Sequence, residues 1–155
     1  MTDFSDLLLP QTVLQNVTAG SKKALLGQLA SVAGDVYGLD AKMVAAVLGA
    51  RERIGSTGFG AGIAIPHGKI AGIDQVVGVF ARVAQPIDYQ AIDDLPVDLV
   101  FMMLSPPDSG VHHLKALARV SRRMRDAGFV AKLRGTGSPD ALYALWTSDE
   151  ERDAA

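Results

Sequence analysis

The sequence predicts a single α/β domain, and three features of the chain indicate this fold class. Segments with apolar residues at helical spacing interleave with short segments rich in β-branched residues, which is the order of elements in α/β proteins. Residues 97–104, VDLVFMML, are nearly all apolar, as in a central strand covered on both faces. A length of 155 residues with short connections suits one compact unit. We expect one domain over residues 1–155, with a core at about 5–147 and a charged tail at 148–155.

The first half of the chain is predicted to form an edge strand and two helices. The alternation of residues 13–17 is typical of a strand at the edge of a sheet. Ser21 and Gly38 are the expected start and end of the first helix, with an apolar stripe of Leu25, Leu29, Val32 and Val36. Asp40 is a suitable N-cap for the second helix and Gly55 a suitable end, with one apolar side formed by Met43, Val44, Val47 and Leu48.

The second half is predicted to continue the alternation of strands and helices. The expected elements are, in order, a glycine-rich loop, strands at 63–65 and 76–83, an acidic turn-like segment at 86–96, the central strand at 97–104, a loop at 105–110, a helix at 111–125, one or two helical turns at 129–133, and a helix from Ser138-Pro139-Asp140. The residues expected to face the core from the two longer helices are Leu114, Leu117, Ala118, Met124, Leu142, Leu145 and Trp146.

The stretch 55–69, GSTGFGAGIAIPHGK, is the main candidate for chemistry. Pro66 has no backbone N–H, so regular strand pairing is expected to end there and to present His67 at the strand end. Gly68 allows a sharp turn and leaves space beside the imidazole. A neutral imidazole held rigidly with clear access is suited to act as a nucleophile near pH 7. The alternative is a histidine in an ordinary loop.

His113 is a second candidate, because it falls in the first turn of the predicted 111–125 helix, at the border of the buried stripe. The positive end of the helix dipole disfavours a protonated imidazole there and favours a bound anion such as phosphate. The alternative is a half-buried structural histidine. His112 is expected to point further round, toward solvent or a neighbour.

Composition and motifs exclude several functional classes. A net charge of −2 gives no indication of nucleic-acid binding, and the absence of cysteine removes disulfides, thiolate zinc sites and cysteine nucleophiles, in keeping with the cytoplasm. We expect no signal peptide and no membrane insertion, because the apolar segments are too short for either. We expect no metal, because no H-E-x-x-H spacing is present. The glycines lead into a strand and lack a following Lys-Ser or Lys-Thr, so they fit neither a dinucleotide fingerprint nor a P-loop. The G-x-S-x-G elbow of a serine hydrolase is also missing.

Four blocks of residues together resemble enzyme IIA of the bacterial phosphoenolpyruvate-dependent phosphotransferase system, in its fructose/mannitol superfamily, and most of all the nitrogen-regulatory IIA proteins. The blocks are Arg51-Glu52-x-x-Gly55-Ser56-Thr57-Gly58, Gly62-Ile63-Ala64-Ile65-Pro66-His67-Gly68-Lys69, Pro86-Ile87-x-x-x-Ala91-Ile92-Asp93 with Pro96-Val97-Asp98-Leu99, and His113-Leu114-x-x-Leu117. The departures are Ala61, where a polar residue is expected, and the extra neighbour His112. The resemblance implies a central mixed β-sheet flanked by helices.

The resemblance also implies roles for individual residues. His67 would be the phosphorylated nucleophile, receiving its phosphoryl group from an HPr-type carrier protein. His113 would position the group, and Arg51 would stabilise its charge. Ser56 and Thr57 would donate hydroxyl hydrogen bonds to it, or would instead cap the loop. No cofactor is implied. Phe59 and Ile65 are candidates to frame a partly apolar docking face, with core burial as the alternative for Ile65.

Three functions follow as expectations. The first is a cytoplasmic phosphocarrier, a phosphotransferase component that regulates partner proteins by its phosphorylation state. In the family these partners include sensor kinases and potassium transport systems. The second is a free-standing sugar-specific IIA component that passes phosphate to an enzyme IIB. The third is a non-catalytic interaction module on the same fold, against which the presence of both His67 and His113 argues. A small-molecule binding domain would depend on the glycine loop alone.

Overall fold

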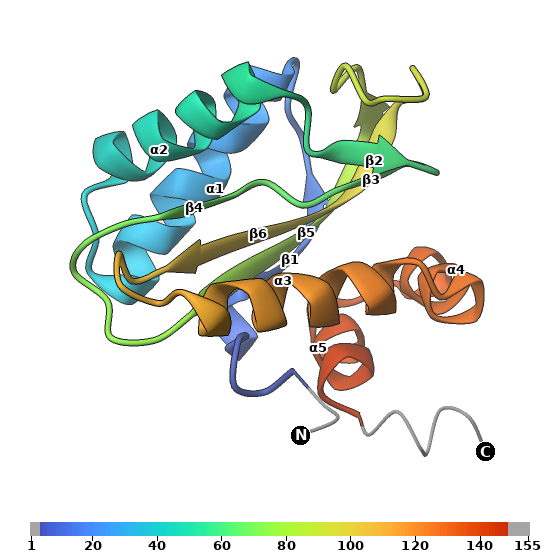
Figure 1. Ribbon diagram of the computed structural model, residues 1–155. Helices are drawn as coiled ribbons and strands as arrows, with labels where there is room; N and C mark the ends of the chain where they lie inside the picture. The colour runs from blue at the N-terminus through green and yellow to red at the C-terminus, as the bar shows by residue number, and fades with distance from the viewer. Residues whose placement is uncertain (1–3, 149–155) are drawn as a thin grey trace.

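The computed structural model describes residues 4–148, which form one domain with a mixed six-stranded sheet (Figure 1). The elements are, in order, η1 Pro10–Thr12, β1 Val13–Val17, α1 Lys22–Tyr37, α2 Ala41–Ile54, β2 Gly58–Gly60, β3 Ile63–Ala64, β4 His67–Lys69, β5 Val77–Ile87, β6 Val97–Ser105, α3 Val111–Met124, α4 Ala127–Gly135 and α5 Pro139–Thr147. The predicted α/β class and mixed sheet are confirmed. Most of the predicted tail lies outside the described residues.

The sheet has the strand order β1-β5-β6-β3-β2, and β4 continues along the same edge of β6 as β3. The β1 strand runs parallel to β5, β5 is antiparallel to β6, and both β3 and β4 are parallel to β6. The predicted edge strand and central strand are therefore both correct. Because β6 contacts β5 on one side and β3 and β4 on the other, it fixes where His67 lies: that residue pairs with Met103.

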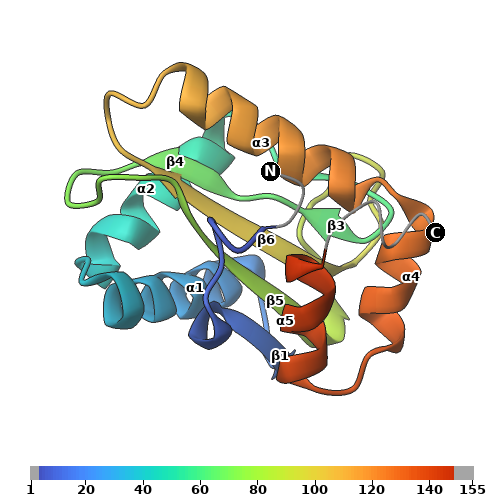
Figure 2. The same ribbon diagram turned by 90° about the horizontal axis from the view of Figure 1, so that it is seen from below.

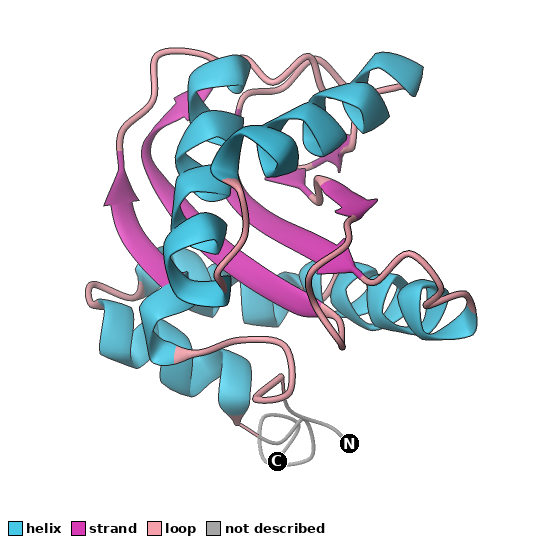
Figure 3. Cartoon of the chain, turned by 90° about the vertical axis from the view of Figure 1, so that its left-hand side faces the viewer, coloured by secondary structure: helices cyan, strands magenta, loops and turns pink. Residues whose placement is uncertain are grey.

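Helices cover both faces of the sheet, so the domain has three layers (Figures 1, 2 and 3). Alternate residues of β6 point into two separate cores, as the period of a strand requires. Val100, Met102 and Leu104 pack with the buried faces of α1 and α2. Leu99, Phe101 and Met103 pack with α3, α4 and α5, where Trp146 contacts Phe4, Phe80, Phe101 and Phe129 with ring centroids 4.9–5.2 Å apart. The almost continuous apolar sequence of β6 follows from this double coverage.

The ends of the helices are set by residues that the sequence identifies. The side chains of Ser21, Asp40 and Ser138 accept hydrogen bonds from backbone N–H groups in the first turns of α1, α2 and α5. Gly38 ends α1 in the left-handed conformation, with φ of 70°, as expected of a glycine at a helix C-terminus. Gly55 ends α2, also as predicted.

Some of the predicted boundaries and burials are wrong. The strand predicted at 76–83 extends to Ile87, so the turn-like segment begins later than expected. The two helical turns expected at 129–133 are a full helix, α4, which Asp126 caps. Leu114 and Ala118 face solvent, and α3 instead buries Ala116, Val120, Arg123 and Met124, because the buried arc of this helix is centred about one residue earlier than predicted. Met43, expected on the apolar side of α2, is 56% exposed.

Candidate functional site

His67 is the first residue of β4, and its backbone is part of the sheet. The prediction that pairing ends at Pro66 is wrong, because pairing is only interrupted at Ile65 and Pro66 and resumes at His67. A proline removes one donor but keeps its carbonyl, and the Pro66 carbonyl accepts a hydrogen bond from the Met103 N–H at 2.9 Å. His67 is therefore fixed by β6 on one side rather than presented beyond a strand end.

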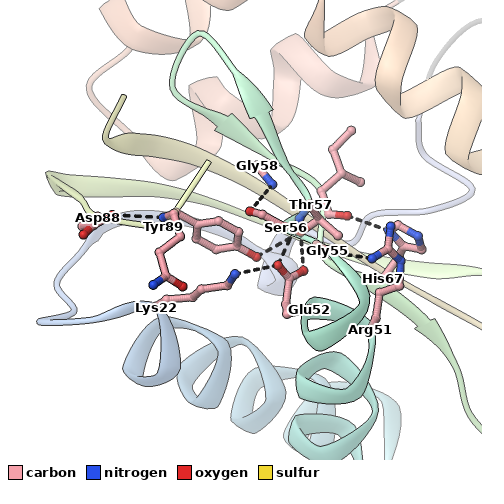
Figure 4. Close-up of polar contacts among 12 residues, drawn as sticks. Lys22, Arg51, Glu52, Gly55, Ser56, Thr57, Gly58, His67, Asp88 and Tyr89 are labelled. Atoms are coloured by element: carbon pink, nitrogen blue, oxygen red, sulfur yellow. Dashed lines mark hydrogen bonds and ion pairs between the residues drawn. The ribbon is translucent and has the colours of Figure 1, made fainter. Parts of the chain in front are cut away.

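The two ring nitrogens of His67 have different environments (Figure 4). Nδ1 lies 2.7 Å from the carbonyl oxygen of Ile65. A carbonyl only accepts hydrogen bonds, so Nδ1 carries the proton and donates it. In the neutral ring, Nε2 then holds the free lone pair. Burial lowers the pKa of the half-buried imidazole below 6.5, and the positive charge of Arg51 acts in the same direction, which favours the neutral ring.

His113 lies in the first turn of α3, and its ring centroid is 5.7 Å from that of His67, with the planes tilted by 50°. Its Nδ1 is 2.6 Å from Ser105 Oγ at the end of β6. Burial and the charges of His67 and Lys69 lower the pKa of His113. The structure thus brings together the two histidines that the sequence singles out, although 45 residues of chain separate them.

Arg51 is in the last turn of α2, where its Nη1 donates a hydrogen bond to the Gly55 carbonyl at 2.9 Å. Figure 4 shows its side chain beside His67. The predicted neighbourhood of Arg51, His67 and His113 is therefore present at one end of β6, assembled from α2, β4 and α3.

The loop hydroxyls of Ser56 and Thr57 have partners within the protein. Ser56 Oγ accepts a hydrogen bond from the Gly58 N–H at 3.1 Å, which is the loop-capping alternative. Thr57 is buried; its hydroxyl donates to Glu52 Oε2 and lies 3.1 Å from the hydroxyl of Tyr89. Of the two, only Ser56 is partly exposed.

Gly68 has a different role from the predicted one. A Cβ atom at Gly68 would lie 2.3 Å from Cγ1 of Val47, so the missing side chain allows α2 to pack directly on β4. The sharp turn that we expected at Gly68 is absent, because Gly68 is in the middle of a strand and pairs with Leu104. The glycine-dependent turn lies earlier, at Gly60 and Gly62, whose φ angles of 117° and 81° reverse the chain between β2 and β3.

The two candidates for a docking face, Phe59 and Ile65, both belong to the core that the sheet forms with α3, α4 and α5. Ile65 is buried, which is the alternative given above, and Phe59 is half-buried under the guanidinium of Arg125, 5.1 Å from the ring centroid. His112 is exposed and lines a groove on the opposite flank of α3, together with Asp6 and Arg119. Large apolar side chains that are exposed on the two helices flanking His67 are Met43, Ile54, Val111 and Leu114.

Sequence reasoning missed the buried polar group behind the site. Glu52 forms an ion pair with Lys22 at 2.8 Å, and its carboxylate accepts hydrogen bonds from the N–H and the hydroxyl of Thr57. Tyr89, which is fully buried, completes the group. The available signal was an aromatic residue inside a segment that otherwise has the composition of an exposed turn.

Two further observations concern the described residues, 4–148. They contain no group of three or more His, Cys, Asp or Glu side chains that could hold a metal ion. None of their helices has the length and apolar character needed to cross a bilayer.

Comparison with known proteins identifies the family. Residues 6–148 match the family model described as "Phosphoenolpyruvate-dependent sugar phosphotransferase system, EIIA 2". The nitrogen regulatory protein of Bradyrhizobium diazoefficiens is 42% identical over 142 residues, which are 92% of this chain and 93% of that protein. The crystal structure of nitrogen regulatory protein IIA-Ntr from Neisseria meningitidis superposes with a TM-score of 0.86 at 32% identity, covering 92% of this chain and 97% of that one.

A more distant match concerns the fold alone. The crystal structure of IIA mannitol from Escherichia coli has a TM-score of 0.75 at 17% identity and covers 90% of this chain and 99% of that one. The match to the family model and the identity to the nitrogen regulatory proteins extend over nearly all the described residues, and both include the segments that carry Arg51, His67 and His113. The chain therefore belongs to the EIIA 2 family of the phosphoenolpyruvate-dependent phosphotransferase system, with nitrogen regulatory proteins among its relatives.

Proposed function

We propose that this protein is a phosphocarrier that accepts a phosphoryl group on Nε2 of His67 from an HPr-type protein. The observation that carries the proposal is the hydrogen bond between His67 Nδ1 and the Ile65 carbonyl, because it leaves Nε2 unprotonated. A nucleophilic imidazole needs a free lone pair in a fixed direction, and β4 supplies the fixed direction. The nitrogen regulatory relatives support the assignment at the level of the family.

The transfer itself is a simple exchange of bonds. The Nε2 lone pair of His67 forms a new N–P bond while the P–N bond to the donor imidazole breaks. The donor ring keeps that electron pair and carries a proton on its other nitrogen, so it leaves as a neutral imidazole. The Nδ1 proton stays on His67 and continues to donate to Ile65. Charge on the equatorial phosphoryl oxygens requires nearby donors. Arg51 and the ring of His113, 5.7 Å from that of His67, are the groups that we assign to this role.

The surface around His67 suits a protein donor. Met43 on α2 and Leu114 and Val111 on α3 are 56%, 64% and 60% exposed, so apolar side chains flank the imidazole on both sides. A partner that covers them excludes water from the transferring group, which strengthens the electrostatic stabilisation. The donor in this scheme is an HPr-type protein.

The output of the protein is regulatory in this proposal. A phosphoryl group on His67 adds nearly two negative charges at the centre of the docking face, so phosphorylated and unphosphorylated forms present different surfaces. We propose that regulated partner proteins, of the sensor-kinase or potassium-transport type, bind the phosphorylated and unphosphorylated forms differently in the cytoplasm. The similarity to nitrogen regulatory proteins supports this branch.

A sugar-specific role is the second candidate, because the family description names sugar transport and the IIA mannitol structure shares the fold. In that case the phosphoryl group passes on to an enzyme IIB. Phosphorylated protein should then lose its label to a sugar-type IIB; retention of the label in the presence of IIB favours the regulatory role.

The direct test is phosphotransfer from phosphoenolpyruvate through enzyme I and HPr, with wild-type protein and two variants. The wild type should gain one acid-labile phosphoryl group and His67→Ala none. His113→Gln should slow the transfer roughly tenfold, the effect of one hydrogen bond of about 1.4 kcal/mol in the transition state. Full labelling of His67→Ala would contradict the site, and an unchanged rate in His113→Gln would remove His113 from the mechanism.

A further inference from the structure

Glu52 is a charged side chain placed where a helix end would normally be solvated. Its side chain is 6% exposed, although it belongs to the last turn of α2, beside the exposed Arg53. A buried carboxylate is costly unless it is paired and hydrogen-bonded. Here it has both: Lys22 Nζ lies 2.8 Å from Oε1, and Thr57 donates to the two oxygens from its N–H, at 3.0 Å, and from its hydroxyl.

The donor and the acceptor can be assigned in each hydrogen bond of the Thr57 hydroxyl. The single hydroxyl proton of Thr57 goes to Glu52, so the hydroxyl of Tyr89, 3.1 Å from Thr57 Oγ1, is the donor in that contact. Tyr89 is fully buried and belongs to the loop between β5 and β6. Glu52 therefore contacts both Thr57 and, through its ion pair with Lys22, helix α1 (Figure 4). Thr57 in turn contacts Tyr89, which connects the group to the 88–96 loop.

Adjacent residues of α2 hold the two ends of the loop that follows it. Arg51 donates to the carbonyl of Gly55, and Glu52 accepts from Thr57. Successive side chains on a helix point about 100° apart, so one faces His67 while the other faces Lys22 and Tyr89. The conformation of residues 55–57 is thus fixed from both sides by the last turn of α2.

This loop is connected to the ring of His67 by two further hydrogen bonds. The carbonyl of Thr57 accepts from the N–H of Ile65 at 3.1 Å. The carbonyl of the same Ile65 accepts from Nδ1 of His67 at 2.7 Å. Ile65 lies in the interruption between β3 and β4, where the ladder to β6 does not hold its backbone. The N–H and the carbonyl of Ile65 belong to successive peptide groups that share its Cα, so the bond to Thr57 helps to fix the position of the carbonyl that His67 contacts.

We propose that Glu52 is a positioning residue: through Thr57 and Ile65 it holds His67 with Nδ1 protonated and Nε2 directed outward. This inference rests on the proposed function, since it concerns the same imidazole. Removal of the carboxylate frees Thr57, lets the backbone of Ile65 shift and weakens the hydrogen bond from His67 Nδ1 that selects the tautomer. The carboxylate contacts neither the phosphoryl group nor the ring and acts only through the backbone.

A purely structural ion pair would behave differently, and the chain offers a matched control. Asp98 pairs with Arg134 through two bonds of 2.8 and 3.0 Å, on the opposite side of β3 from α2. Like the Glu52–Lys22 pair, it joins residues of two separate elements, here β6 and α4 instead of α2 and α1, but within residues 4–148 its carboxylate has no hydrogen bond to residues 55–57 or to Ile65. Asp98→Asn should therefore lower stability without affecting His67.

The experiment compares the wild type with Glu52→Ala, Glu52→Gln and Asp98→Asn. Two-bond ¹H–¹⁵N spectra of the unphosphorylated proteins report which nitrogen of His67 carries the proton. Transfer rates from phosphorylated HPr and thermal melts complete the comparison. Glu52→Ala should convert a single Nδ1–H tautomer into a mixture and slow transfer about tenfold. Glu52→Gln keeps an amide oxygen for the Thr57 N–H, so it should recover most of the rate and the tautomer even if Glu52→Ala folds poorly.

Either of two results would overturn the proposal. One is a Glu52→Ala protein with the wild-type tautomer and rate and only a lower melting temperature, as expected for Asp98→Asn. The other is an Asp98→Asn protein as slow as Glu52→Ala, which would mean that lost stability alone explains the effect. If wild-type protein accepts no phosphoryl group, the proposed function fails, while the tautomer comparison still decides the role of Glu52.

Discussion

At the scale of single residues, the proposed phosphoryl transfer depends on keeping one imidazole neutral next to the positive charge of Arg51. His67 is half-buried, with Arg51 and His113 close to it. Burial, and then the charge of Arg51, lower the pKa of His67, while its bond to Ile65 and the charge of Glu52 act against this. The pKa of His113 is also lowered, by burial and then by the charge of His67. With both pKa values lowered, neither ring is readily charged at neutral pH.

We predict that the acceptor activity survives to a pH below the ordinary pKa of histidine. The unprotonated ring is the reactive form, so the kcat/KM of phosphoryl acceptance should fall only below pH 6.5, the ordinary value. Measurement of the transfer rate between about pH 5 and pH 8 with a fixed donor concentration checks this. A midpoint above 6.5 would mean that the environment favours the charged ring.

The same shift predicts the direction of a stability change. A histidine whose pKa is lower in the folded than in the unfolded protein binds more protons when unfolded, so its effect on stability is absent above pH 6.5. Stability should decrease as the pH falls from 6.5 through the folded pKa. Denaturant titrations of wild type and His67→Ala at several pH values measure this, and the decrease over that range should be smaller in the variant.

At the scale of elements, the contact of α2 with β4 determines how close Arg51 comes to His67. Val47 lies one turn before Arg51 on the same flank of α2, and it packs where a side chain at Gly68 would be. The missing Cβ thus sets the distance between the helix and the strand that carry the guanidinium and the imidazole.

We predict that Gly68→Ala destabilises the protein by about 1–3 kcal/mol, because its Cβ would lie 2.3 Å from Val47 Cγ1 and α2 would have to move. Chemical denaturation measures the loss. Gly27→Ala, at an exposed position of α1 with no atom within 4 Å of the added Cβ, is the control and should stabilise by about 0.5–1 kcal/mol. Val47→Ala should restore part of the loss in Gly68→Ala; a Gly68→Ala protein as stable as wild type would show that the contact is loose.

The elements also show what a sequence can reveal about this fold. Helix starts at Ser21, Asp40 and Ser138 were predictable, since capping is a local interaction written in neighbouring residues. The two candidate histidines could be singled out as well, although their 5.7 Å separation depends on how β4 and α3 pack.

What could not be predicted involves contacts between distant segments. The burial of Glu52 requires Lys22, Thr57 and Tyr89 to meet from three separate elements, and no local pattern records that meeting. Gly68 gave the same difficulty, because a glycine in a short motif indicates a turn as readily as close packing. The resumption of the strand after Pro66 was missed because only the loss of a donor was considered, whereas the Pro66 carbonyl still accepts from Met103.

At the scale of the whole molecule, the candidate site lies at one end of the sheet, and none of its residues lies at the opposite end. The end of β6 that pairs with His67 is flanked by α2 and α3, which expose Met43 and Leu114 there. The loop before β6, at the opposite end, exposes Ile92 and Leu95. Both ends therefore carry exposed apolar side chains, but only the first end carries His67. The proposed function thus predicts different outcomes for the same substitution at the two ends.

We predict that Leu114→Ala raises the KM for an HPr-type donor about five- to tenfold, since a leucine that is 64% exposed has apolar surface to bury in the complex. The kcat should change little, because the side chain contacts no reacting atom. Leu95→Ala is the matched control: the same truncation, 53% exposed, at the far end of β6, should leave both constants unchanged. Steady-state transfer kinetics with increasing donor concentration separate the two. Equal effects of the two substitutions, or an effect of Leu95→Ala alone, would place the donor away from the face that carries His67.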